Sequence, residues 1–124
     1  MDSNHTERSD TVDVDGTITR PRNGSVLYRT EATPWQHENE DGFAYKTLFE
    51  DPKTHQTTVL MRVEAGALAG SHAHDQLEQV LVLEGTFYDD DRTYGPGDFI
   101  VRAPGAMHTG GSKTGALVLL IYSA

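Results

Sequence analysis

The sequence predicts an all-β fold, an antiparallel sandwich or barrel made of many short strands. A chain of 124 residues supports one domain. Only 8% of its residues are aromatic and 12 are glycine, which fits a sheet protein with tight turns better than a helix bundle. Apolar residues alternate over short runs that glycine and proline interrupt. The run AYKTLFEDPK is the one stretch whose pattern also allows a helix.

The N-terminal region, residues 1–25, is predicted to be a flexible arm. It is rich in Asp, Ser, Thr and Asn and has almost nothing to bury. Residues 26–124 should then form the folded domain. Trp35, the only tryptophan, opens the strongly patterned part and is expected to anchor a core or an interface.

The first strong pattern along the chain predicts a β-hairpin. The runs FAYKTLFED and HQTTVLMRV alternate in polarity, and the segment Pro52–Thr54 between them has turn chemistry. Val59, Met61 and Val63 lie two residues apart, so they share one face of the second strand.

The segment GALAGSHAHDQLEQVLVLEG, from Gly66 to Gly85, follows the hairpin and carries the candidate metal ligands. Side chains alternate across a strand, so His72 and His74 point to the same face. After a short turn, the run LEQVLVL reads as a strand with Glu78 near its start. Two imidazoles and one carboxylate therefore converge. Together they suit a borderline divalent metal such as Zn, Fe, Mn, Ni or Co.

The strand that begins at Glu78 is apolar on both faces. Period two puts Val80 and Val82 on the face of Glu78, where they are expected to line a small dry pocket or to pack in the core. Leu81 and Leu83 face the other way, toward a second packed layer or a partner subunit.

Two more strands and their turns complete the chain. TFYDDDRTYGPGDFIVRAP combines short strands with turn chemistry at Asp89–Asp91 and Gly95–Gly97. The last strand is predicted over Gly115–Ser123. Arg102 has two open orientations: inward, where it would pair with an acidic ligand neighbour or a substrate carboxylate, or outward as a surface charge.

The ligand segment resembles the first signature of the cupin superfamily, G-x5-H-x-H-x3-E-x6-G, at every fixed position. The second signature is matched by GDFIVRAPGAMH, in which Gly97, Gly105 and His108 take the family positions. The resemblance implies a cupin jelly-roll barrel, a closed double sheet. It also implies one metal ion held by His72, His74, Glu78 and His108.

Within that superfamily, the run RAPGAMHTGGS, with VLVLEGTFYDD before it, is similar to the cupin domain of ChrR-type anti-sigma factors. The resemblance extends back to about Trp35. In that family the cupin domain carries zinc and follows a separate helical domain that binds the sigma factor. Only a short polar segment precedes the resemblance here, which implies a stand-alone ChrR-like cupin without the sigma-binding activity.

Composition limits the partners and the location. The formal net charge of −9 argues against nucleic acid and against an anionic membrane as partners. Cysteine is absent, so the redox compartment stays open. The N-terminus lacks the pattern of a secretory signal, and the longest apolar run, Ala116–Tyr122, is too short to span a bilayer. A cytoplasmic protein is expected.

Three functions remain open. The first is a metalloenzyme that resembles small ferrous dioxygenases acting on β-diketones or related oxygenated compounds, where the metal is a Lewis acid and template. The second is a ChrR-like sensor or ligand-binding module in which zinc stabilises the fold and the pocket takes a small molecule. The third is a structural module. In each, one divalent ion per chain is expected, with zinc or iron first, and a homodimer is expected from Leu81, Leu83 and the arm.

Overall fold

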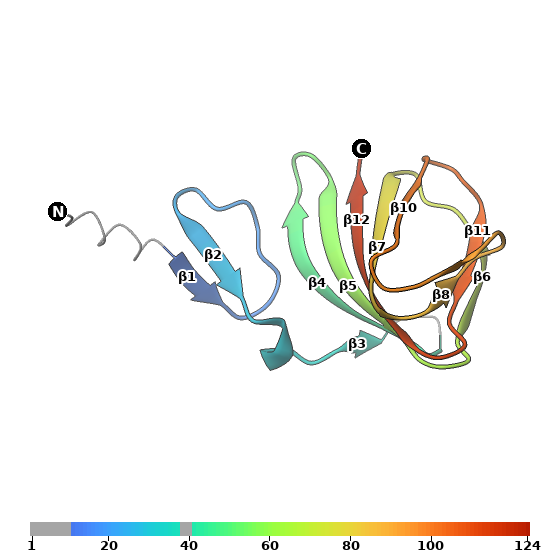
Figure 1. Ribbon diagram of the computed structural model, residues 1–124. Helices are drawn as coiled ribbons and strands as arrows, with labels where there is room; N and C mark the ends of the chain where they lie inside the picture. Colours follow the sequence, from blue (N-terminus) through green and yellow to red (C-terminus); the bar gives the residue numbers. More distant parts are fainter. Residues whose placement is uncertain (1–10, 38–40) are drawn as a thin grey trace.

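The computed structural model describes residues 11–37 and 41–124, and almost all of its regular structure is β-strand (Figure 1). A single 3-10 turn, Thr30–Ala32, is the exception within these described ranges. No helix among them is long and apolar enough to cross a membrane. The prediction of an all-β fold is confirmed.

Two larger antiparallel sheets face each other and form the jelly roll (Figure 1). The six-stranded sheet has the order β10-β7-β12-β5-β4-β3 and the four-stranded sheet the order β6-β11-β8-β9. The strands of the first are β3 (Gln36–His37), β4 (Phe43–Asp51), β5 (Gln56–Val63), β7 (Leu77–Gly85), β10 (Phe99–Arg102) and β12 (Ala116–Ser123). Those of the second are β6 (Leu68–His72), β8 (Phe87–Tyr88), β9 (Thr93–Tyr94) and β11 (His108–Gly111).

The predicted hairpin is present as β4 and β5, so the run that also allowed a helix is a strand. Tyr45 lies opposite Met61 and Thr47 opposite Val59. The reason is hydrogen bonding at both edges of the pair, because β12 continues the sheet beyond β5 and β3 continues it beyond β4. Alternating residues then pack inward.

The core forms on the inner face of the six-stranded sheet, where four valines are almost fully covered. Val63, Val80, Val82 and Val118 are each no more than 2% exposed. Val118 lies opposite Val82, and Leu120 lies opposite Val80. One step further along the same strands, Tyr122 lies opposite Glu78. The polar pair of Glu78 and Tyr122 therefore lies next to the apolar pair of Val80 and Leu120, at the end of the barrel where β12 ends.

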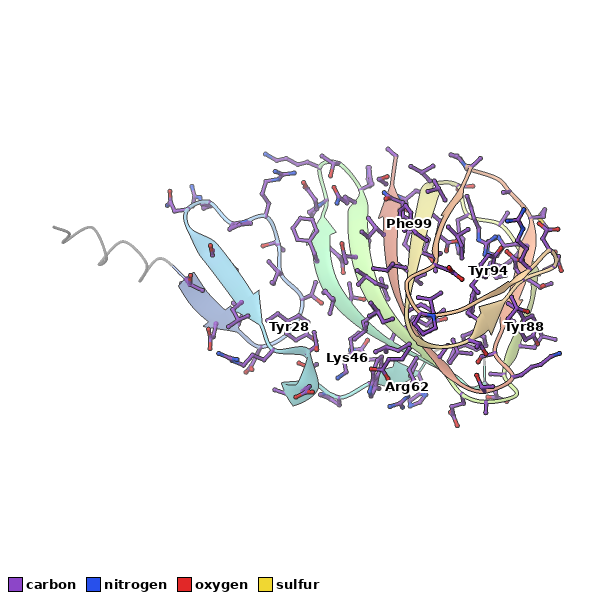
Figure 2. The ribbon with its side chains drawn as sticks, viewed as in Figure 1. Tyr28, Lys46, Arg62, Tyr88, Tyr94 and Phe99 are labelled. Carbon is purple, nitrogen blue, oxygen red and sulfur yellow. The ribbon has the colours of Figure 1, made fainter. Side chains whose placement is uncertain are left out.

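The outer face of β4 and β5 is covered by the segment that contains Trp35. The indole ring lies 4.5 Å from Nζ of Lys46 and 4.6 Å from the guanidinium carbon of Arg62, and Figure 2 shows the two cations beside each other on this face. Lys46 also donates to the carbonyl of Thr30 and is buried. Trp35 thus anchors the chain to the sheet through its ring faces.

The described part of the predicted arm makes contacts of its own. Strand β1 (Thr11–Val14) pairs in parallel with β2 (Ser25–Tyr28), outside the two larger sheets (Figure 1). The N–H of Ile18 donates to the carbonyl of Leu48 at 2.8 Å. Arg20 binds the buried carboxylate of Asp51. Residues 1–10 lie outside the described residues, and the flexibility of the arm and the boundary at residue 26 stay predictions.

Candidate metal centre

Three histidines meet between the two sheets. His72 ends β6 and lies directly opposite His108, which begins β11. His74 follows two residues after His72. One ring nitrogen from each of the three lies within 4.8 Å of the others, and the closest rings, those of His72 and His108, have centroids 4.4 Å apart. Cross-strand pairing and strand alternation together bring the imidazoles to one point.

Backbone carbonyls orient two of these rings. Nδ1 of His72 lies 2.7 Å from the carbonyl oxygen of Gly70, and Nδ1 of His108 lies 3.2 Å from that of Ala106. A carbonyl can only accept, so Nδ1 carries the hydrogen in each ring. Nε2 then keeps its lone pair, which is the arrangement that metal-binding histidines use.

The most buried imidazole, His108, is biased toward its neutral form. Burial lowers the pKa of His108, and the positive charge of Arg102 acts in the same direction, whereas the hydrogen bond to Ala106 opposes them. The net shift is downward. A neutral imidazole at neutral pH is ready to bind a cation.

Glu78 lies beside the histidines at the start of β7 and is only 4% exposed. Its Oε2 is 3.6 Å from Nε2 of His74, and its Oε1 is 3.7 Å from Nε2 of His108. These separations are too long for hydrogen bonds. They are close to the spacing of about 3.4 Å that two ligand atoms have around one tetrahedral zinc ion. The three histidines alone form the group whose ligand atoms lie within 4.8 Å of one another, and Glu78 is outside that group. Glu78 is near two of them, but through different oxygens, Oε2 toward His74 and Oε1 toward His108, so its role as a fourth ligand stays a prediction.

Two other side chains donate hydrogen bonds to the carboxylate of Glu78. Nε of Arg102 donates to Oε1 at 3.1 Å, and the hydroxyl of Tyr122 donates to Oε2 at 2.8 Å. Both donors are cross-strand neighbours of Glu78, Arg102 on β10 and Tyr122 on β12. Arg102 therefore points inward, which settles the orientation that the sequence left open.

Arg102 binds a second carboxylate, that of Asp89. The Nη1–Oδ2 distance is 2.8 Å. Oδ2 also accepts from the hydroxyl of Tyr94 at 2.8 Å, and Oδ1 accepts from the backbone N–H groups of Asp91 and Arg92. Burial raises the pKa of Asp89, but these donors, with Arg102 first among them, outweigh burial and hold it at about 2. The predicted turn at Asp89–Asp91 therefore also holds the side chain of Arg102 in place.

Two further polar residues complete the surroundings. Burial raises the pKa of Tyr122, and the negative charge of Glu78 raises it further, so the hydroxyl stays protonated and donates. Asp90 accepts from Oγ1 of Thr109 at 2.7 Å and so fixes the residue that follows His108. Sequence reasoning missed Tyr122, although alternation along the last strand from Leu120 would have placed it on the inner face.

The histidine cluster opens onto a cavity of about 90 Å³ between the sheets. Val80 lines it as predicted, whereas Val82 packs in the core, 1% exposed. The polar side of the cavity consists of the three histidines, Glu78, Arg102 and Tyr122, and the other side is largely apolar. The cavity wall includes Phe43, Tyr45, Met61, Ala69, Val80, Phe87 and Leu120.

The remaining histidines lie away from the centre. His37 and His55 are exposed, on β3 and on the turn between β4 and β5, as the sequence analysis expected. His5 lies outside the described residues.

Solved structures with the same fold come from several sources. An RmlC-like cupin from Shewanella frigidimarina is 23% identical, with a TM-score of 0.67, over 75% of this chain and 85% of the other. A complex of Rhodobacter sphaeroides SigE with the anti-sigma ChrR matches at 24% identity and a TM-score of 0.64, over 77% of this chain and 52% of the matched chain. A candidate acetylacetone dioxygenase from Methylibium petroleiphilum is 12% identical, with a TM-score of 0.74, over 86% and 82%.

Similarity in sequence narrows the family. No curated protein matches this chain. The family model for the ChrR Cupin-like domain, however, matches residues 23–123, a span that includes both strands of the hairpin and all four candidate ligands. The chain therefore belongs to the ChrR cupin-like family.

Proposed function

We propose that this protein is a metal-binding cupin with a mononuclear centre held by His72, His74, Glu78 and His108. The observation that carries the proposal is the convergence of three histidine ring nitrogens within 4.8 Å of one another. The buried carboxylate of Glu78, 3.6 and 3.7 Å from two of these rings, supports its inclusion as the fourth ligand. One divalent ion per chain is expected, zinc or iron first, with manganese, nickel and cobalt as alternatives, because this donor set serves all of them.

Different residues around the proposed centre would orient its ligands and limit its contact with water. Carbonyl contacts fix the tautomers of His72 and His108. Arg102 and Tyr122 orient Glu78, so the carboxylate needs little reorganisation to bind a cation. The apolar wall of the cavity limits water beside the site. A bound divalent ion would supply Lewis acidity toward an oxygen atom of a ligand.

The first test of the centre is the metal content of the full chain purified without a histidine tag. We expect about one ion per chain in the unaltered protein and a loss of most of it in His74→Ala. His37→Ala is the matched control, because His37 is exposed, on the edge strand β3, and is not in the cluster; the metal content of this variant should not change. Full occupancy in His74→Ala would overturn the assignment.

Of the three functions that the sequence leaves open, two uses of the centre have specific support. Likeness of fold to the candidate acetylacetone dioxygenase favours an oxygenase that acts on a small oxygenated organic substrate. Membership of the ChrR cupin-like family favours a zinc-binding sensor or ligand-binding module without catalysis. Fold likeness alone is weak support for an activity. Glu78 is the one carboxylate among the described residues that line the cavity, so a general base would have to be this residue.

Oxygen uptake separates the two uses. The ferrous form of an oxygenase should consume oxygen with a β-diketone or hydroxyketone, and the zinc form should not, because zinc has no redox chemistry. A sensor should retain zinc, and small ligands should raise its melting temperature without turnover. Uptake no greater than that of free ferrous ion, across a panel of such substrates, would eliminate the oxygenase.

A further inference from the structure

The charges around the cavity do not cancel once a divalent ion is bound. Arg102 lies between two carboxylates, those of Glu78 and Asp89. One carboxylate balances Arg102, and the other offsets half the charge of a divalent ion. The three imidazoles are neutral when they bind metal. One positive charge is therefore left over, in a place where burial makes an unbalanced charge costly.

The rest of the cavity wall cannot balance that charge. Phe43, Met61, Val80, Phe87 and Leu120 contribute only apolar surface. The volume of about 90 Å³ is room for roughly three water-sized groups, since water takes about 30 Å³ in the liquid. A ligand that fits must bring one negative charge at its polar end and a short apolar chain at the other.

A second hollow adjoins the cavity. Its volume is about 340 Å³, and it shares four residues with the cavity wall: Tyr45, His74, Leu120 and Tyr122. Its outer side is polar, with Thr47 and Gln76. A small ligand entering here would pass His74 before its chain reached the apolar wall.

We propose that the site binds a small organic monoanion, a carboxylate or enolate with a short alkyl chain of about two carbons. Its oxygen atoms face the histidine cluster, and its chain lies against Phe43, Met61 and Leu120. The inference rests on the proposed metal centre and adds the chemical class of the ligand. Alkylammonium ions are excluded by charge, and longer chains by the size of the cavity.

The test is calorimetric titration of the zinc-loaded full chain with n-alkanoates from acetate to hexanoate. The affinity should rise roughly fourfold per methylene, as expected for a buried CH₂, and then stop rising or fall once the cavity is full. n-Alkylammonium ions of the same lengths should show no binding at the same concentrations. Equal affinities for the two series would overturn the proposal.

Two variants locate the binding. Leu120→Ala enlarges the cavity and should move the best chain length upward. Leu119→Ala is the matched control, because it removes the same side chain from the opposite face of β12 and should leave the length preference unchanged. If Leu120→Ala does not fold, Ala69→Val, which narrows the cavity wall, should move the best length downward. A length preference that no cavity variant shifts would place the alkanoates elsewhere and contradict the proposal.

The same samples show whether a negative result concerns the proposed metal centre or only the proposed ligand class. Zinc content is measured before each titration. If the unaltered chain does not retain zinc, the proposed metal centre fails. If zinc is retained at one per chain and alkanoates do not bind, the centre stands and the ligand class is wrong. Alkanoate binding of equal strength to the metal-free chain would also contradict the proposal, because the unbalanced charge comes from the ion.

Discussion

At the scale of single residues, the proposed centre relies on side chains that are not themselves metal ligands but hold one of the proposed ligands, Glu78, in place. Arg102 has only 12% of its side chain exposed and holds Glu78 and Asp89 at once. Tyr122 holds the other oxygen of Glu78. A carboxylate fixed at both oxygens faces the histidines in one orientation, which lowers the reorganisation needed when a cation binds.

Replacing Arg102 tests this arrangement. Arg102→Gln leaves two buried carboxylates without their cation, and breaking a buried pair in this way costs about 3 to 5 kcal/mol. We expect a loss of that order in the free energy of unfolding, measured with urea. Arg92→Gln is the control, since Arg92 is exposed and should change stability by less than about 0.5 kcal/mol. Equal effects of the two variants would show that Arg102 does not carry the network.

The carboxylate of Asp89 predicts a dependence of stability on acid. Its pKa of about 2 lies below the ordinary value of 3.8, so it adds stability that is fully present above about pH 4 and is lost as the pH falls toward 2. Asp89→Asn removes that contribution. The difference in unfolding free energy between the unaltered chain and this variant should therefore shrink over that range. A difference that stays constant from pH 5 to 2 would contradict the ion pair with Arg102.

The four candidate ligands could be predicted from the sequence because their spacing is local or belongs to a signature. Asp89 and Tyr122 could not be identified in the same way. Asp89 has the sequence context of an ordinary turn, and Tyr122 ends an apolar strand 44 residues after Glu78. Their roles arise only when β7, β10 and β12 align in one register.

At the scale of elements, alternation and turn chemistry were enough to predict the main strands. The hairpin of β4 and β5 and the strand β7 appear where the pattern placed them. The β-bulges between Thr47 and Phe49 and between Leu117 and Val118 were not predicted. An extra residue in one strand leaves no distinctive composition, and it follows from the curvature that closing a barrel requires.

The glycines of the two signatures give a prediction at this scale. Gly85 has a φ of 71°, and a Cβ there would lie 1.9 Å from the carbonyl oxygen of Gly115. Gly97 has a φ of 90° with open space around it. Gly97→Ala should cost about 1 kcal/mol in unfolding free energy through backbone strain alone, and Gly85→Ala should cost about 2 kcal/mol more through the clash. Equal losses in urea unfolding would contradict the close approach of β7 and the turn before β12.

At the scale of the whole molecule, one edge of the larger sheet is apolar and open. Strand β10 is the last in its sheet, and Phe99 and Val101 on its outer face are 56% and 54% exposed. Leu83 on the neighbouring strand is 40% exposed. An open edge with apolar side chains favours pairing with another chain, and a second copy of this chain is the partner that we expect.

The dimer can be tested by light scattering with size exclusion. We expect a dimer that strengthens with salt, because screening weakens the repulsion between two chains of net charge −9. Phe99→Asp should give a monomer, whereas Val12→Asp, at an equally exposed position on β1, should not. An unaltered chain that stays monomeric at high concentration would contradict the prediction.

A crystal structure of the zinc-loaded chain, with anomalous diffraction at the zinc edge, tests the proposed metal centre most directly. One anomalous peak per chain is expected, with Nε2 of His72, His74 and His108 and one oxygen of Glu78 at about 2.0 to 2.2 Å from the ion. A peak bound by other residues, or an ion held by the histidines while Glu78 contacts only Arg102 and Tyr122, would contradict the four-residue centre.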